Sequence, residues 1–302
     1  MRGIDMDALQ ARARLFRELH RSPGDGPLLP ANVWDAGSAA LLGQLPGVRA
    51  LATTSAGMAA AHGLPDGERL GLDRLLASLM LIGRSTALPY SVDLEAGYGG
   101  SAQEVADSVA SVVECGACGV NLEDGDPGAP GRLLPAGEHA TRVAAARSAA
   151  DQLGVPIVVN ARTDTYWRPY QGPDRFAATI RRLDEYRAAG ADCLFVPGFP
   201  EPGLTPAQQR SAIRELVALA EGVPVNLLYR PDLPPLPVLG ELGVARVTVG
   251  SALYRLAMAA ARDSMAALLG TGTPDPLRPA DRLPYGRLAD ALGSAARGRG
   301  PA

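Results

Sequence analysis

The chain has 302 residues, which is enough for one large α/β domain or two small ones. Its formal net charge is -3 at pH 7, and no long run of one sign provides a surface for nucleic acid. The chain contains no stretch of about 18 apolar residues that would suggest a membrane span, and residues 1–21 lack the apolar centre of a signal peptide. We therefore expect a cytoplasmic protein without nucleic-acid or membrane partners.

Short apolar runs recur along the chain, and most are followed by a segment with helical periodicity. We predict strands at residues 28–31, 50–53, 90–93, 119–122, 157–160, 193–196, 223–228 and 246–249. The amphipathic segments include residues 72–85, 102–114, 137–153, 174–189 and 205–220. Alternating strands and helices indicate parallel βαβ units, and eight units in about 250 residues predict a (β/α)8 TIM barrel of the α/β class.

Glycines that precede the predicted strands support this assignment, since a helix C-terminus favours a left-handed residue there. These glycines are Gly116, Gly154, Gly190, Gly222 and Gly243. A doubly wound open sheet is the alternative, but no glycine-rich phosphate loop follows the first strand. We predict one domain over residues 1–302, with its core at about 28–260 and extra N- and C-terminal helices. The Pro-, Gly- and Arg-rich segment at about 271–302 is either a frayed tail or an arm that packs on a neighbouring subunit.

Two cysteines, Cys115 and Cys118, have the spacing of a redox or zinc pair. No second Cys or His pair completes a four-ligand zinc site. We interpret both as small thiols packed at a helix–strand turn, where free cysteine behaves as a small hydrophobic residue.

Polar residues end three consecutive predicted strands, at the edge where a TIM barrel places its active site. A two-residue strand period puts Asp93 and Glu95 on one face, and likewise Asn121 and Glu123. Neighbouring carboxylates repel unless a cation lies between them. Oxygen ligands without His or Cys favour Mg²⁺ or Mn²⁺. We predict that the three acids converge on one divalent ion; the alternative is that they form ion pairs at the rim.

The fifth strand ends with Asn160, Arg162 and Asp164 on one face. A guanidinium among acids and a metal is suited to a planar carboxylate, which it binds through paired hydrogen bonds. Alternatively, Arg162 neutralises Asp164 or Glu123, and both roles are compatible.

At these strand ends the sequence resembles the isocitrate lyase/phosphoenolpyruvate mutase superfamily. The matching motifs are Asp-Leu-Glu-Ala-Gly-Tyr-Gly at 93–99, Gly-Val-Asn-Leu-Glu-Asp at 119–124 and Asn-Ala-Arg-Thr-Asp at 160–164. Further similar segments are 34–39, 53–58, 63–66, 195–198 and 243–251. The resemblance extends from about residue 28 to residue 260, and the agreement of several motifs in register makes it specific.

The resemblance implies a role for each site residue. The metal would be bound directly by Asp93, and Glu95 and Glu123 would hold its water ligands. The substrate would meet Arg162 at one charged end, and the remaining candidate substrate-binding residues are Thr54, Ser55, Ala56, Asp66, Asn121 and Asn226. Asp66 resembles the aspartate near the mouth that orders the loop over the site.

The resemblance also implies a mobile gate at residues 124–138. Its glycines and prolines are typical of a lid whose closure excludes water. They are Gly125, Pro127, Gly128, Pro130, Gly131 and Pro135. The gate lacks the Lys-Lys-Cys-Gly-His sequence of isocitrate and methylisocitrate lyases. Pro197 stands where phosphonopyruvate mutases and hydrolases have a histidine. These differences argue against all of those individual activities.

The chemistry shared across the superfamily remains. We expect a Mg²⁺-dependent lyase that breaks a carbon–carbon bond in a small 2-hydroxy or 2-oxo carboxylic acid through a metal-stabilised enolate. Arg162, Glu123 and Tyr98 are the candidate catalytic residues; Arg132, His139 and bound water are other possible proton carriers. The alternatives are a phosphonopyruvate-type carbon–phosphorus mutase or hydrolase, and a barrel that binds a metabolite without turnover. The resemblance further implies a homodimer or homotetramer.

Overall fold

The computed structural model describes residues 5–21, 26–129 and 131–297. Eight parallel strands form one sheet in chain order. They are β1 (Ala31–Val33), β2 (Leu51–Thr53), β3 (Tyr90–Asp93), β4 (Gly119–Glu123), β5 (Val158–Arg162), β6 (Cys193–Phe195), β7 (Val225–Leu228) and β8 (Arg246–Thr248). An isolated parallel bridge between Leu28 and Arg246 joins the segment before β1 to β8. The prediction of a (β/α)8 barrel is therefore confirmed.

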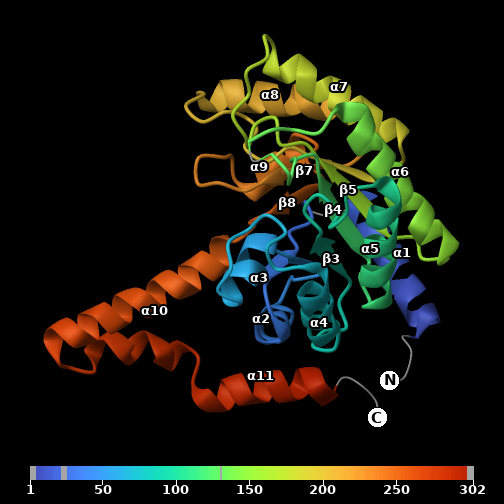
Figure 1. The fold of residues 1–302 in the computed structure, drawn as a ribbon. Coiled ribbons are helices and arrows are strands. Elements are labelled where there is room, and N and C mark those ends of the chain that lie inside the picture. The colour runs from blue at the N-terminus through green and yellow to red at the C-terminus, as the bar shows by residue number, and fades with distance from the viewer. Residues whose placement is uncertain (1–4, 22–25, 130, 298–302) are drawn as a thin grey trace.

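The helices from α2 to α9 alternate with the strands and pack around the outside of the barrel, whereas the arm formed by α10 and α11 extends away from it (Figure 1). The helices are α1 (Met6–Arg21), α2 (Ala36–Leu42), α3 (Ser55–Ala61), α4 (Leu72–Gly83), α5 (Ala102–Glu114), α6 (Ala136–Gln152), α7 (Arg175–Ala188), α8 (Pro206–Leu219), α9 (Leu236–Glu241), α10 (Ala252–Thr271) and α11 (Tyr285–Arg297). A 3₁₀ helix, η1 (Asp275–Arg282), connects α10 to α11. Within the described residues, no helix is long and apolar enough to cross a bilayer.

The first predicted strand was placed too early in the chain. We expected residues 28–31, whereas β1 begins at Ala31 and Leu28 forms only a single bridge. Pro30 lies between them and has no backbone N–H to donate to a sheet ladder, which interrupts the strand. The other seven strands agree with the prediction to within two residues at each end.

Local signals explain why the helices begin and end where they do. Ser101 and Glu104 form a capping box at the start of α5, and Thr205 and Gln208 form one at the start of α8. The five glycines predicted to end helices all have positive φ, between 68° and 98°. The turns between the helices and the following strands can therefore be predicted directly from the sequence.

Helix α1 covers the N-terminal ends of the central strands. Arg17 donates to the carbonyl oxygen of Ile157 at 3.3 Å and pairs with Asp192 at 2.8 Å, just before β5 and β6. Phe16 is fully buried and packs so closely on Gly119 that an added Cβ there would lie 2.9 Å from its ring. The amphipathic segment at the start of the chain is thus part of the barrel core.

The cysteines are free thiols. Cys118 is buried and Cys115 half-buried at the turn between α5 and β4. Burial raises the pKa of the Cys118 thiol to about 11, so it is protonated at neutral pH. This is the environment expected of thiols packed as small apolar groups.

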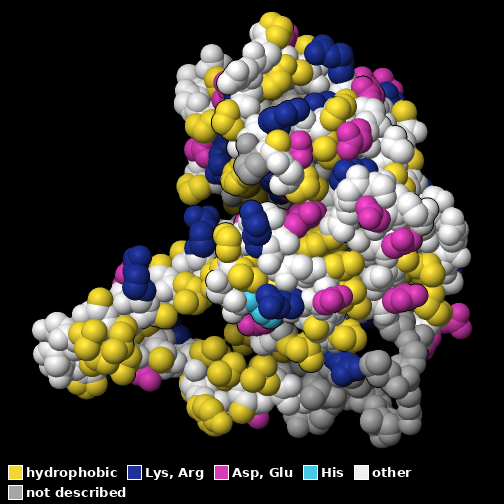
Figure 2. Space-filling model, viewed as in Figure 1, with side chains coloured by type: hydrophobic (Ala, Val, Ile, Leu, Met, Phe, Trp, Pro, Cys, Tyr) yellow, Lys and Arg dark blue, Asp and Glu magenta, His cyan; other side chains and the backbone are white. Residues whose placement is uncertain are grey.

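The C-terminal segment is helical as far as residue 297, and residues 298–302 lie outside the described part. Helix α10 projects away from the barrel, and α11 returns alongside α2 (Figure 1), where Gln44 donates to the carbonyl oxygen of Ala291 at 2.8 Å. No side chain of α10 is buried. Hydrophobic side chains lie along this projecting arm (Figure 2), including Leu256, Met258, Met265 and Leu269.

Candidate active site

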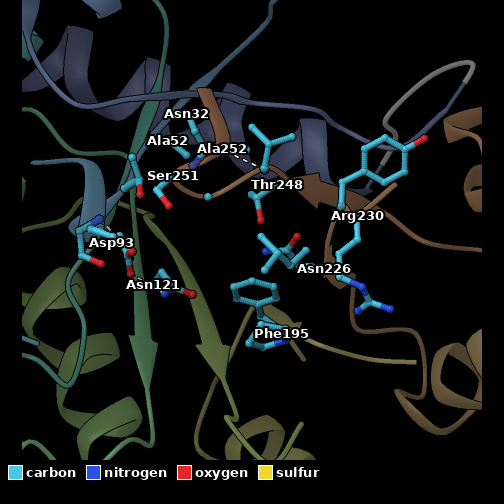
Figure 3. Close-up of a pocket in the computed structure, with 18 of the residues that line it drawn as sticks. Asn32, Ala52, Asp93, Asn121, Phe195, Asn226, Arg230, Thr248, Ser251 and Ala252 are labelled. Atoms are coloured by element: carbon cyan, nitrogen blue, oxygen red, sulfur yellow. Dashed lines mark hydrogen bonds between the residues drawn. The ribbon is translucent and has the colours of Figure 1, made fainter. Parts of the chain in front are cut away.

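A cavity of about 800 Å³ lies inside the barrel and opens at the carboxyl ends of its strands. Figure 3 shows side chains from several strands pointing into it. Eight of the predicted site residues line it: Thr54, Ser55, Ala56, Asp66, Asp93, Asn121, Arg162 and Asn226. The predicted residues Glu95, Tyr98 and Glu123 are not part of its lining.

Asp93 ends β3 and presents a half-buried carboxylate to the cavity (Figure 3). Its Oδ1 accepts a hydrogen bond from Asn121 Nδ2 at 2.8 Å, and its Oδ2 accepts one from the backbone N–H of Ser55 at 3.1 Å. Asn160 Nδ2 donates in turn to Asn121 Oδ1 at 2.9 Å. Side chains on β4 and β5 therefore fix the carboxylate while leaving further lone pairs on its oxygens.

The segment from Thr54 to Ala56 begins α3 and faces the same cavity. The Thr54 hydroxyl caps the helix by accepting from the backbone N–H of Gly57 at 3.5 Å. The N–H of Ser55 is already donated to Asp93. Ala56 lies in the first turn, where helix geometry gives its N–H no intrahelical acceptor.

Asp66 lines the cavity beside these groups. Burial raises the pKa of its carboxyl, and the nearby carboxylate of Asp93 raises it further, whereas a hydrogen bond from Ser55 lowers it. Asp66 therefore lies at the cavity, and its role in binding substrate or ordering a loop stays a prediction.

The expectation that Glu95 continues the strand face of Asp93 is wrong. Strand β3 ends at Asp93, and Glu95 adopts a left-handed backbone with φ 52°. Its Oε2 accepts hydrogen bonds from the backbone N–H groups of Gly67 and Glu68 at 2.8 and 2.7 Å. The two-residue period holds only while the chain is extended, and here the chain turns one residue after the strand.

Tyr98 is tied into the same group of loops. Its hydroxyl donates to Glu95 Oε1 at 2.9 Å, and its backbone N–H donates to Glu68 Oε1 at 2.7 Å. Glu68, Glu95 and Tyr98 all have positive φ, between 52° and 60°. Strained backbone of this kind persists only where surrounding contacts hold it, and it is common at functional sites. We call Gly67, Glu68, Glu95 and Tyr98 the loop clamp.

The loop clamp depends on Gly97, which has φ 109° and packs against Val105. An added Cβ at this position would lie 2.7 Å from Val105 Cγ2. We expect Gly97→Ala to lower the free energy of unfolding by roughly 2–3 kcal/mol, from backbone strain and overpacking together. Urea unfolding measures the change. Gly100→Ala is the matched control because its Cβ would meet only Glu104 Oε2, at 3.5 Å; equal losses in the two variants would contradict this account.

Glu95 makes the stability of the metal-free protein depend on pH. Burial, followed by the carboxylates of Asp66 and Asp93, raises its pKa to about 7. Between pH 6.5 and 8 folded Glu95 thus holds more protons than unfolded Glu95, so its contribution to stability falls as pH rises. His20 and His139, with pKa values near 3, are neutral when folded but still partly protonated in the unfolded chain near pH 6.5, so their contribution rises with pH and opposes that of Glu95.

We expect the free energy of unfolding of the wild type, measured in EDTA relative to that of Glu95→Gln, to fall by about 0.5–1 kcal/mol between pH 6.5 and 8. Glutamine keeps the acceptor oxygen without titrating, so this difference isolates Glu95 from the two histidines. An unchanged profile in the variant would show that another group carries the dependence.

Glu123 faces Arg162 and a second arginine that the sequence did not reveal. Arg162 Nη1 lies 2.8 Å from Glu123 Oε2, and Arg168 Nη2 lies 3.2 Å from Oε1. Both arginines also pair with the fully buried Asp164, at 2.6 and 2.9 Å. Burial opposes the charge on Arg162, but Asp164 and Glu123 outweigh it and raise the pKa of the guanidinium. The neutralising role considered for Arg162 is therefore present, and Arg162 still lines the cavity.

The three predicted metal ligands do not form a cage of protein ligands. Among the described residues, no three His, Cys, Asp or Glu side chains are placed together to hold a metal ion. Only Asp93 faces the cavity; Glu95 is held by the loop clamp and Glu123 by the two arginines. Both nevertheless lie close enough for the charge of Asp93 to raise their pKa values.

The segment predicted to be a gate is shorter than expected. Asp124 is fully buried and accepts hydrogen bonds from Thr163 Oγ1 at 2.8 Å and Tyr186 OH at 2.7 Å. Arg182 pairs with it at 3.0 Å, and α6 already begins at Ala136. The connecting loop therefore covers residues 125–135, of which Pro130 lies outside the described residues. Its mobility stays a prediction.

The other proton carriers considered from the sequence lie away from the cavity. His139 is fully buried in α6 with its ring 4.7 Å from that of Tyr186, and burial lowers its pKa to about 3. Arg132 is exposed in the loop. Neither residue lines the cavity.

Several lining residues were not singled out as site residues from the sequence. Trp167 follows β5 and is 55% exposed, with the Arg162 guanidinium carbon 6.0 Å from its ring. Arg230 follows β7, where its Nε and Nη2 pair with Asp232. Arg246 lies within β8. Arg246 could have been recognised from the sequence as a charged residue inside an apolar strand. No local sequence pattern distinguishes Trp167 or Arg230 as a site residue.

Comparison with known proteins gives consistent results. The family model for phosphoenolpyruvate phosphomutase matches residues 16–269. An uncharacterized protein of Mycobacterium tuberculosis is 34% identical over 254 residues, covering 82% of this chain and 85% of that protein. A 2-methylisocitrate lyase of Escherichia coli is 35% identical over 170 residues, covering 54% of this chain and 55% of the enzyme. The crystal structure of 2,3-dimethylmalate lyase superposes with a TM-score of 0.76 at 26% identity, covering 94% of this chain and 95% of that one.

Proposed function

We propose that this chain, which belongs to the phosphoenolpyruvate phosphomutase family, cleaves a carbon–carbon bond in a small 2-hydroxy or 2-oxo carboxylic acid. The family is part of the isocitrate lyase/phosphoenolpyruvate mutase superfamily of lyases and mutases. The observation that carries this proposal is that a carboxylate, Asp93, and a guanidinium, Arg162, line the same cavity. The names of two relatives, 2-methylisocitrate lyase and 2,3-dimethylmalate lyase, favour carbon–carbon over carbon–phosphorus chemistry.

The donor set fits Mg²⁺ (or Mn²⁺) bound mainly by water. Mg²⁺ keeps several water ligands and needs only one or two carboxylates. Asp93 would be the direct ligand, and Glu95 and Glu123 would hold the ion's waters. Burial raises the pKa values of both glutamates most, and repulsion from Asp93 adds to the rise; a cation would relieve this repulsion. When bound, the ion would supply Lewis-acid charge that stabilises an enolate as the bond to C3 breaks.

The chain's own residues would bind and orient the substrate. Arg162, held from behind by Glu123 and Asp164, offers a fixed positive charge to one carboxylate without reorganisation during the reaction. Ser55, Ala56 and Asn121 would orient the other end of the molecule, near Asp93. Thr54, Asp66 and Asn226 complete the proposed contacts.

Tyr98 and water in the cavity are the proposed proton carriers. The hydroxyl of Tyr98 is engaged by Glu95, so it would act through that carboxylate rather than by reaching the substrate. Water in the cavity is the alternative carrier. We keep Tyr98 and Glu123 as proposed catalytic residues, with Glu123 acting through the orientation of Arg162.

A panel of 2-oxo and 2-hydroxy acids, including phosphonopyruvate, tests the proposal in buffer containing Mg²⁺. Release of a smaller 2-oxo acid or of carbon dioxide supports the lyase. Release of inorganic phosphate, or isomerisation between phosphonate and phosphate ester, would support the carbon–phosphorus alternative, which the name of the matching family favours. Tight binding without any product would support a metabolite-binding barrel.

We also propose that the protein acts in the cytoplasm as a homodimer or homotetramer. Helix α10 exposes Met258, Met265 and Leu269 on one helical face, and an exposed apolar face of this kind is typical of a protein–protein contact. Light scattering coupled to size-exclusion chromatography should give a mass of two or four times 31.3 kDa. A mass of one chain at micromolar concentration would contradict this prediction.

A further inference from the structure

The largest fully buried side chain among the described residues belongs to Arg246, at the start of β8 inside the barrel. Its Nη1 lies 3.3 Å from His20 Nε2, and its Nη2 donates to Ser91 Oγ at 3.3 Å. Its guanidinium carbon lies 5.8 Å from the centre of the Phe16 ring. Within the described part of the chain, no carboxylate lies within 4.0 Å of it.

Each of these partners is neutral. His20 Nδ1 lies 2.7 Å from the carbonyl oxygen of Phe16, so this nitrogen carries the proton and Nε2 accepts from Arg246. Burial, with a smaller effect from the neighbouring guanidinium, lowers the pKa of His20 to about 3, so the ring is uncharged at neutral pH. The groups in contact with the positive charge of Arg246 are therefore neutral acceptors and an aromatic face, and the carboxylate of Asp93 acts on it only from beyond ion-pair distance.

A buried charge without a counter-charge is energetically costly. Burial also lowers the pKa of Arg246, although an arginine stays protonated at neutral pH. Its Nε is buried and has no hydrogen-bond partner among the described residues. Among the described residues, the side chain thus has a charge without an ion-pair partner, and a donor without an acceptor.

The active-site cavity extends down to this arginine. Arg246, Ser91 and Asn226 all contribute to its lining. Asn226 is the register partner of Arg246 on β7 and is fully buried, yet neither its Oδ1 nor its Nδ2 has a partner in the described structure. Figure 3 shows Asn226 beside Thr248 on the inner wall. Two adjacent strands therefore present unused donors to the same floor of the cavity.

We propose that this floor is a binding site for a small carboxylate, held between Arg246 and Asn226. A single guanidinium balances one negative charge, which favours a monovalent carboxylate over a phosphate dianion. The Nε of Arg246 and the Nδ2 of Asn226 are the donors, and the hydroxyl of Ser91 stays with Nη2. The site does not depend on the lyase proposal, because it requires neither the metal nor turnover.

Formate is a suitable probe because it is the smallest carboxylate. In EDTA, the thermal midpoint of the full-length wild-type protein should rise by roughly 2–4 °C at formate concentrations tenfold above its Kd. Arg246→Met should abolish the formate-dependent rise, while Arg278→Met, at an exposed surface pair, should retain it. Comparing variants in the same buffers removes the general effect of salt.

Asn226→Asp provides a second variant of nearly identical shape. It places a carboxylate next to Arg246 within the chain, so its midpoint should no longer respond to formate. Its midpoint without formate should equal or exceed that of the wild type. This variant keeps the test decisive even if Arg246→Met does not fold. Equal formate responses in the wild type and in both folded variants would overturn the site, as would a crystal structure in formate with only water between Arg246 and Asn226.

The carboxylate can come from a free anion or from the distal end of a dicarboxylate ligand. Succinate titrations with and without saturating formate distinguish these sources. If formate displaces succinate from the wild type but not from Arg246→Met, the floor takes a distal carboxylate. If both bind together, the site takes a separate anion. If neither perturbs the wild type, the proposal is wrong.

Discussion

Asp93→Asn is expected to slow turnover of the accepted 2-oxo or 2-hydroxy acid by about a thousandfold or more. Asparagine has nearly the same shape, and its one oxygen can accept from the N–H of Ser55 while the bond from Asn121 Nδ2 is lost, so the fold should stay intact at the cost of one hydrogen bond. What disappears is the negative charge that faces the cavity from β3. The proposed ion then loses its direct ligand.

Steady-state rates over a range of Mg²⁺ concentrations measure this effect, with metal affinity followed separately by calorimetry. Asp107→Asn is the matched control because Asp107 is exposed on α5 and only accepts a hydrogen bond from Gln103 at 2.9 Å. The control should keep wild-type rates. If Asp93→Asn retains activity within tenfold at the same Mg²⁺ concentration, Asp93 is not the metal ligand.

Arg162→Met should damage both stability and activity. Arg162 lies between Glu123 and Asp164, and its removal leaves two buried carboxylates sharing Arg168 alone. We expect the free energy of unfolding to fall by roughly 3 kcal/mol, because removing one partner of a buried ion pair leaves a buried charge that is no longer fully neutralised. The value of kcat/KM should fall by about a thousandfold because the fixed charge facing the substrate is lost.

Urea unfolding and steady-state kinetics separate the two effects of this substitution. Arg262→Met is the control: its guanidinium is 78% exposed beside Asp263, and exposed pairs contribute little. We expect it to change stability by less than about 0.5 kcal/mol. Arg162→Lys should recover part of the stability but little of the activity, because an ammonium cannot bond both carboxylates and the substrate with the same geometry. Full activity in Arg162→Lys would rule out a specific role for the guanidinium.

The sequence predicts the barrel well because its signals are local and repeated. Apolar runs bury both faces of the parallel strands, and left-handed glycines end the helices before them. Asp93, Asn121 and Arg162 lie at the ends of such runs, so their direction into the cavity follows from the strand period.

The rest of the site depends on geometry beyond the strands. Glu95 is two residues past the end of β3, where a left-handed turn cancels the strand period. Arg168 is six residues past β5, and its pairing with Glu123 joins the loop after β5 to the last residue of β4, in a different βα unit. The Asp35–Ser38 and Ser101–Glu104 caps can be recognised from spacing alone; the loop clamp cannot, because its members are about 30 residues apart.

Helix α1 also determines how short this protein can be made. The helix acts as a stopper beneath the strands, with Phe16 against Gly119 and His20 against Arg246. A chain shortened to begin at Leu28 would keep every strand and every proposed site residue, yet its barrel would be open at both ends. Water would then reach Arg246 from the N-terminal ends of the strands, and the barrel interior would be open to solvent at both ends. The smallest functional unit therefore begins upstream of the first strand.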